Sequence, residues 1–141
     1  YRSWEVKTTG NELAHTILRG AVNKHGNCIP NYHYEDLNLV DRLYKERNLK
    51  NPAVVVDANH SNSNKQYAEQ VRIVNEVLHS RNLNPHIKTL VKGVMIESYI
   101  EGGNQKCSPE VEHVYGKSIT DPCLSFEDTK TLLLEMIDLL D

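Results

Sequence analysis

Three short runs of apolar, mostly β-branched residues recur along the chain, and each ends in polar or charged side chains. The central run covers residues 54–59, where three valines give way to Asp57 and then to His60. Similar runs occupy residues 15–20 and 93–98. A continuous apolar run of this length is typical of a parallel strand buried on both faces. We therefore expect three buried strands that each deliver a charged group at the same end.

Helical periodicity separates these strands. Apolar residues recur every three or four positions over residues 35–48, 65–79 and 126–140, and a short helical turn is expected at 87–91. In the last of these helices the expected inner face is made of Leu132, Leu133, Met136, Ile137 and Leu140. Alternating strands and helices require parallel strands joined by right-handed crossovers. The sequence thus predicts an α/β fold.

Three further segments fall outside this alternation. Residues 1–9 alternate polar and apolar side chains, which predicts an N-terminal β arm ending at the turn Gly10-Asn11. Residues 21–34 are expected to form a loop. A longer loop is expected over residues 100–125, and a loop of this length in a small domain favours a functional role.

The composition narrows the possible function classes. The chain has 141 residues, a net charge of −3 and 25% charged residues. These values suit one modest domain and give no reason to expect nucleic acid or a membrane as partner. Three cysteines without CxxC spacing favour reduced thiols in the cytoplasm over a disulfide framework. The sequence contains neither a GxGxxG motif nor a Walker loop, so nucleotide binding has no support.

A histidine and two carboxylates form a candidate metal site. His60 and Glu97 follow two of the predicted strands, and Asp121 lies in the long loop. An imidazole with two carboxylates suits Mn, Fe, Co or Zn. Each residue alone is better explained as a satisfied polar group at a strand end. Their common position at one edge favours a site, and Cys123 lies near enough to Asp121 to be a further possible ligand.

Two basic residues are candidates for binding an anionic substrate. Arg19 ends the first predicted strand, and its guanidinium suits phosphate or carboxylate, although a structural ion pair explains it as well. Lys117 lies among Gly, Ser and Thr, where it could hold phosphate and take part in catalysis; a solvated loop lysine is the alternative. Asp57 either orients a neighbouring ligand or is a buried structural carboxylate.

Several segments of the chain resemble the type I 3-deoxy-D-arabino-heptulosonate 7-phosphate (DAHP) synthases. The matching segments are Leu18-Arg19-Gly20, Pro30-Asn31-Tyr32, Asp57-Ala58-Asn59-His60-Ser61-Asn62-Ser63-Asn64-Lys65, Gly93-Val94-Met95-Ile96-Glu97-Ser98, Gly103-Asn104-Gln105 and Tyr115-Gly116-Lys117-Ser118-Ile119-Thr120-Asp121-Pro122-Cys123. They occur in the family's order over nearly the whole chain, so the resemblance is specific.

The resemblance implies a metal-dependent transferase that condenses phosphoenolpyruvate with erythrose 4-phosphate in the first step of the shikimate pathway. Such an enzyme serves aromatic amino acid biosynthesis. The family's metal ligands fall on His60, Glu97 and Asp121, and a phosphoenolpyruvate-binding arginine falls on Arg19. Ala21 stands where a second glycine is common in the family, and the loop that follows looks longer than usual.

The resemblance covers only the C-terminal part of the family's (β/α)8 TIM barrel. Residues 1–141 are therefore expected to be the C-terminal portion of a single barrel domain: three βα units with an N-terminal β arm. The family's cysteine metal ligand and its Lys-Pro-Arg-Thr motif have no counterpart here, which predicts a fragment that is inactive alone. The expected partner is the missing half of the barrel or a second copy of the chain, giving a homo-oligomer.

Two other functions fit the same residues. The chain could be a catalytically silent half-barrel with a structural or regulatory pairing role. If the resemblance were misleading, a generic metal-dependent aldolase barrel would remain.

Overall fold

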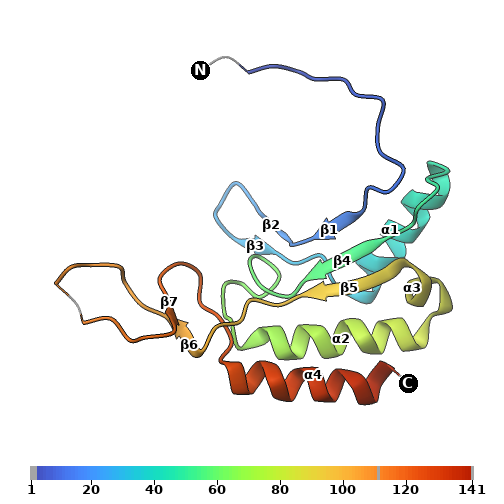
Figure 1. Cartoon of the computed structure of the whole chain (residues 1–141). Helices are drawn as coiled ribbons and strands as arrows, with labels where there is room; N and C mark the ends of the chain where they lie inside the picture. The colour runs from blue at the N-terminus through green and yellow to red at the C-terminus, as the bar shows by residue number, and fades with distance from the viewer. Residues whose placement is uncertain (1–2, 111, 141) are drawn as a thin grey trace.

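The computed structural model describes residues 3–110 and 112–140, which form a three-stranded parallel sheet with helices packed on one face (Figure 1). The strands are β1 (Thr16–Leu18), β4 (Val54–Asp57) and β5 (Val91–Met95). β4 is central and pairs in parallel with both neighbours. The three predicted strands and the parallel α/β fold are therefore confirmed.

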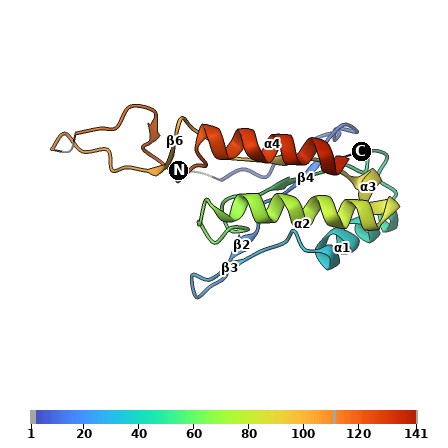
Figure 2. The ribbon, with the colours of Figure 1, turned by 90° about the horizontal axis from the view of Figure 1, so that it is seen from below.

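In the described part of the chain, four helices accompany the sheet: α1 (Tyr34–Glu46), α2 (Glu69–Leu83), α3 (Pro85–Leu90) and α4 (Phe126–Leu140). Figure 2 shows α2 between α4 and α1. Two helix starts are capped locally. The backbone N–H of His33 donates to Asp36 in a capping box before α1, and Asn84 accepts from the His86 N–H before α3. Among the described residues, no helix is both long and apolar enough to cross a membrane.

The core lies between the sheet and the helices. Val54 and Val56 of β4 are fully buried, and Ile73 and Val77 of α2 belong to the same buried cluster. The other face of the sheet is open: Ile17 is 46% exposed and Met95 is 42% exposed. The expectation of strands buried on both faces was wrong for this chain, because no helix in the described part of the chain covers that second face.

The predicted inner face of α4 is only partly correct. Leu132 is buried and Met136 packs against the core, but Leu133, Ile137 and Leu140 are exposed. α4 contacts the rest of the fold mainly through α2. One stripe of the helix is therefore buried, and the remaining apolar residues face outward.

The predicted N-terminal β arm was wrong within the described residues. Residues 3–11 form no strand, and a turn follows at Glu12 and Leu13; Tyr1 and Arg2 lie outside the described residues. Trp4 and Val6 are largely exposed. An alternating pattern gives a strand only when a sheet edge is available for pairing, and this segment runs away from the sheet (Figure 1).

Both predicted loops contain short strand pairs. β2 (Ala21–Val22) and β3 (Cys28–Ile29) form an antiparallel hairpin. Within residues 100–125, β6 (Glu101–Asn104) pairs in parallel with β7 (Lys117–Ser118) at the base of a projecting excursion (Figure 1).

Helix α2 begins at Glu69 rather than Lys65. Residues 60–65 form successive turns, with positive φ at His60, Asn64 and Lys65. A right-handed helix excludes such angles, so the helix begins only after them.

Candidate functional site

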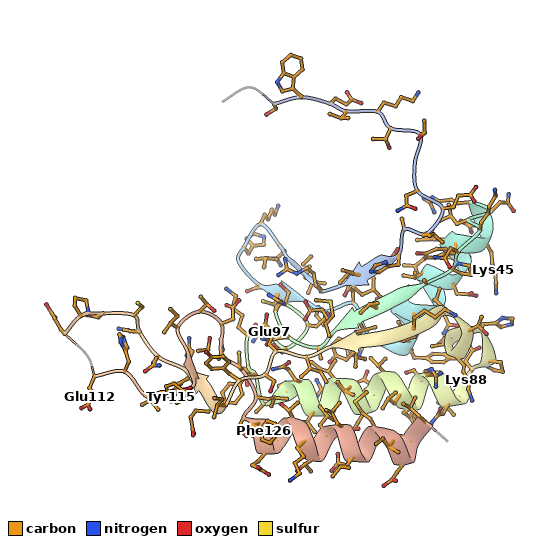
Figure 3. All side chains as sticks on the ribbon, viewed as in Figure 1. Lys45, Lys88, Glu97, Glu112, Tyr115 and Phe126 are labelled. Atoms are coloured by element: carbon orange, nitrogen blue, oxygen red, sulfur yellow. The ribbon has the colours of Figure 1, made fainter. Side chains whose placement is uncertain are left out.

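The carboxyl ends of the parallel strands carry the predicted charged groups. His60 follows β4, Glu97 follows β5, and Asp121 lies between β7 and α4. Figure 3 shows Glu97 at the end of the sheet opposite Lys45 and Lys88. The edge at the carboxyl ends of parallel strands is where βα loops assemble active sites in barrels.

The structure brings the three predicted metal ligands together. Nε2 of His60 lies 3.4 Å from Oε1 of Glu97 and 3.8 Å from Oδ2 of Asp121. One candidate ligand atom from each residue lies within 4.8 Å of the other two. A divalent ion binds such atoms at about 2.0–2.2 Å, so a small inward movement would suffice for all three to reach one ion.

Asp57 holds His60 in the orientation that a metal ligand needs. The Asp57 carboxylate is buried, and its Oδ2 accepts a hydrogen bond from Nδ1 of His60 at 2.8 Å. A carboxylate only accepts, so Nδ1 carries the proton and Nε2 presents a lone pair toward Glu97 and Asp121. This carboxylate–histidine pair is a recurrent way to orient a metal-binding imidazole. Of the two interpretations left open by the sequence, the contacts favour the orienting role.

A network of buried amides fixes the turn that carries His60. The Asn62 side chain donates to the carbonyls of Leu18 and Asp57, at 3.0 and 2.8 Å, and accepts from the Asn31 N–H at 2.9 Å. Asn62 thus ties β1 to β4 just below the site. His60 itself has a φ of 49°, in the left-handed region that non-glycine residues adopt uncommonly.

Arg19 lies on the same edge. Its Nε is 3.9 Å from Oδ2 of the buried Asp57, while most of its side chain is exposed. Arg19, His60, Lys65 and Asp121 line a pocket of about 430 Å³. Lys65 was not predicted as a site residue, because the apolar spacing that follows it places it at the start of a helix. The pocket therefore combines two basic residues with two of the candidate metal ligands.

Lys117 lines the neighbouring pocket rather than this one. That pocket has a volume of about 560 Å³, and Glu97, Asp121 and Cys123 also line it. Asp121 belongs to both pockets. Lys117 and Arg19 therefore flank the candidate metal site from two sides.

Cys123 is not among the groups that converge with His60 in the described part of the chain. Its thiol donates weakly to the carbonyl of Asp121 at 3.4 Å. Burial raises the pKa of the Cys123 thiol, and the nearby carboxylates of Glu97 and Asp121 add to that rise. On geometry, the histidine and the two carboxylates are therefore the candidate set in that part of the chain.

The fold and this edge together define an α/β protein that assembles its polar groups at the carboxyl ends of parallel strands. The chain belongs to the DAHP synthetase I family, whose profile matches residues 3–134. The Trp-sensitive phospho-2-dehydro-3-deoxyheptonate aldolase of Salmonella typhimurium is 35% identical over 136 residues, which cover 96% of this chain and 36% of that protein. A phospho-2-dehydro-3-deoxyheptonate aldolase of Haemophilus influenzae is 37% identical over 133 residues, which cover 94% of this chain and 34% of that protein.

A solved structure shares the fold. The phospho-2-dehydro-3-deoxyheptonate aldolase of Francisella tularensis matches with a TM-score of 0.75 and 30% identity, over 94% of this chain and 36% of that one. The chain thus spans little more than a third of the length of these relatives. The predicted family and the predicted partial coverage are both confirmed.

Proposed function

We propose that this chain carries the metal-binding edge of a DAHP synthase, the transferase that condenses phosphoenolpyruvate with erythrose 4-phosphate. The convergence of His60, Glu97 and Asp121 in a member of this family supports the proposal most directly. We further infer that residues 1–141 are the C-terminal portion of one (β/α)8 barrel domain that works in the cytoplasm. The open sheet face and the partial coverage of the relatives support the assignment of these residues to part of a larger barrel.

The residues present fit a divalent ion, and we assign Mn, Fe, Co or Zn to the three ligands. When bound, such an ion supplies Lewis-acid polarisation of the aldehyde oxygen or activates a water. Asp57 keeps the Nδ1 proton of His60 in place and leaves Nε2 free as a ligand. Arg19 would bind the phosphate or carboxylate of phosphoenolpyruvate and fix its orientation. Lys117 would hold a phosphate on the other side of Asp121 and contribute to catalysis.

The proposal is tested by an assay with phosphoenolpyruvate, erythrose 4-phosphate and added Mn²⁺. The assay is run on this chain and on a version extended to the length of the relatives. We expect condensation by the extended version, its loss on chelation and its recovery when Mn²⁺ is restored. We expect no turnover by the 141-residue chain. An extended protein that binds both substrates but does not condense them at any Mn²⁺ concentration would refute the proposal.

An Arg19→Lys variant of the extended protein should lose more than tenfold in kcat/KM, or more than about 1.4 kcal/mol of transition-state stabilisation. Lysine keeps the charge but lacks the planar fork that grips phosphate or carboxylate with two parallel bonds. Steady-state kinetics with varied phosphoenolpyruvate measures the effect. Arg42→Lys is the matched control, because Arg42 pairs with Glu46 on an exposed face of α1. If Arg19→Lys kept a nearly normal kcat/KM, the assignment of Arg19 as a substrate-binding residue would be wrong.

A catalytically silent half-barrel that pairs with another polypeptide is the second candidate function. The exposed side chains of Ile17 and Met95 on the open sheet face favour it, together with the outward apolar stripe of α4. An exposed apolar surface next to unpaired strand edges is typical of an interface. The missing half of the barrel or a second copy of the chain would cover it.

The purified chain is accordingly expected to self-associate. Light scattering across a dilution series should give a mass above that of one chain, falling only at the lowest concentrations. Charged substitutions at Ile17 and Met95 together should shift the equilibrium toward the monomer, whereas charged substitutions at Leu39 and Leu83, exposed apolar residues on the helices, should not. A monomer that melts cooperatively at high concentration would contradict the expectation.

A further inference from the structure

We propose that Asn59 is a positioning residue that sets the two carboxylate ligands of the metal site, with Ser63 fixing the orientation of its amide. The inference rests on the proposed function, because it assigns a role in building the same site. Asn59 precedes His60 and contributes to the lining of the pocket that Arg19 and Lys65 share, but its amide is bonded to protein groups. It is 2% exposed and lies beneath the site.

The Asn59 amide contacts both segments that carry the carboxylates. Its Nδ2 donates to Oε2 of Glu97 at 2.6 Å and, more weakly, to the carbonyl of Pro122 at 3.4 Å. The first bond occupies one Glu97 oxygen. The other oxygen, Oε1, is left facing His60 Nε2 at 3.4 Å. The second bond restrains the backbone at Pro122, which follows Asp121. One buried NH₂ group therefore contacts both segments that carry an acidic ligand.

The orientation of this amide is itself determined by hydrogen bonds. Ser63 Oγ donates to Asn59 Oδ1 at 2.9 Å, which directs the NH₂ group toward Glu97. A flipped amide would place its oxygen 2.6 Å from a carboxylate oxygen, an arrangement that is strongly repulsive. The Asn59 backbone N–H donates to Oδ1 of Asp57 at 2.9 Å. The carboxylate that orients His60 therefore also anchors Asn59.

Glu97 is fixed at its main chain by a second buried amide. Gln70 of α2 is fully buried; its Nε2 donates to the Glu97 carbonyl at 3.2 Å, and its Oε1 accepts from the Glu97 N–H at 2.8 Å. With the backbone held in this way, the remaining freedom of Glu97 is rotation of its side chain. The bond from Asn59 limits that rotation, which is why Asn59 rather than Gln70 governs the oxygen presented to an ion.

Metal binding by the full chain provides the test. Mn²⁺ is titrated by electron paramagnetic resonance, and Co²⁺ is added separately to read its visible absorption, which reports ligand geometry. We expect Asn59→Ala to weaken Mn²⁺ binding about 10- to 100-fold, the usual cost of losing a group that orients a metal ligand, and to change the Co²⁺ spectrum. Ser63→Ala should weaken binding less.

A double-mutant cycle separates positioning from general destabilisation. If Ser63 acts through Asn59, then Ser63→Ala causes no further loss of affinity in the Asn59→Ala background. Asn84→Ala is the matched control. Asn84 is a half-buried asparagine far from the site, where its side chain caps α3 and donates to Asn38. The substitution should lower the melting temperature and leave Mn²⁺ affinity unchanged. If Asn59→Ala fails to fold, the test uses Ser63→Ala alone, with the same measurements of Mn²⁺ affinity and of the Co²⁺ spectrum.

The outcomes distinguish this inference from the proposed function. If the unsubstituted chain binds Mn²⁺ and both Asn59→Ala and Ser63→Ala bind it equally well with the same Co²⁺ spectrum, the positioning role is wrong and the metal site stands. If the losses of Mn²⁺ affinity in Asn59→Ala and Ser63→Ala add fully in the double variant, Ser63 does not act through Asn59, and the role assigned to Ser63 is wrong. If neither the unsubstituted chain nor the version extended to the length of the relatives binds Mn²⁺, both the site and the inference fail.

Discussion

A His60→Ala variant is expected to lose Mn²⁺ binding and, in the extended protein, all Mn²⁺-dependent turnover. His60 supplies the imidazole that lies within 4 Å of both candidate carboxylates, at 3.4 Å from Glu97 and 3.8 Å from Asp121. Two carboxylates without it would repel each other and bind an ion only loosely. The substitution also leaves the buried Oδ2 of Asp57 without its closest partner, so a loss of about 1–3 kcal/mol in the free energy of unfolding is expected as well.

The stability loss must be separated from the loss of the ligand. Asp57→Asn removes the charge that orients His60 but leaves the imidazole, so it should weaken Mn²⁺ binding without abolishing it. His79→Ala, on the exposed face of α2, should change neither binding nor stability. Mn²⁺ titration and urea unfolding of the three variants measure both effects. Undiminished Mn²⁺ binding by folded His60→Ala would show that His60 is not a ligand.

The strands and most helices could be predicted because their signals are local. The apolar run at residues 54–59 and the helical spacing of α4 depend on neighbouring residues, and the predicted bounds of α4 agree with the structure. The hairpin of β2 and β3 could not be predicted from such signals. Each of its strands has two residues, too few for an alternating pattern to be distinguished from a loop.

At the start of α2, tertiary contacts override the local preference for a helix. From Lys65 onward the apolar spacing suits a helix, yet the backbone at Asn64 and Lys65 has positive φ. The turns that precede the helix are held by Asn62, whose partners Leu18 and Asn31 lie far away in the sequence. Because these hydrogen bonds join residues that are distant in the sequence, no local pattern of apolar and polar residues predicts them.

The same distinction applies to the candidate site. His60 and Glu97 were predicted because a charged residue directly after an apolar strand is a recognisable pattern. The supporting residues Asn59, Ser63 and Gln70 were not predicted. Each is polar and buried, and their side chains matter through bonds to one another or to Glu97. The polar stretch after β4 was the available signal, because an asparagine-rich segment buried behind a strand must satisfy its amides internally.

A Gly20→Ala variant should lose about 3 kcal/mol or more of unfolding free energy. Gly20 has a φ of +71°, and an alanine there costs about 1–3 kcal/mol in backbone strain. The new Cβ would also lie 2.8 Å from Cβ of Ser61 and 2.9 Å from the carbonyl oxygen of Ile29. Crowding of this kind in a packed region typically adds about 1–3 kcal/mol. Because Ser61 follows His60, the displacement should reach the metal site.

Gly26 provides the matched control for this substitution. It lies in the turn of the same hairpin with a φ of +81°, and a Cβ there would meet nothing within 4 Å. Gly26→Ala should therefore cost only the same backbone term, about 1–3 kcal/mol, and leave Mn²⁺ affinity unchanged. Urea unfolding of both variants gives the difference, which isolates the contact between the β1–β2 turn and the segment after His60. Equal losses in the two variants, with Mn²⁺ affinity unchanged in both, would show that this contact neither constrains the fold nor supports the site.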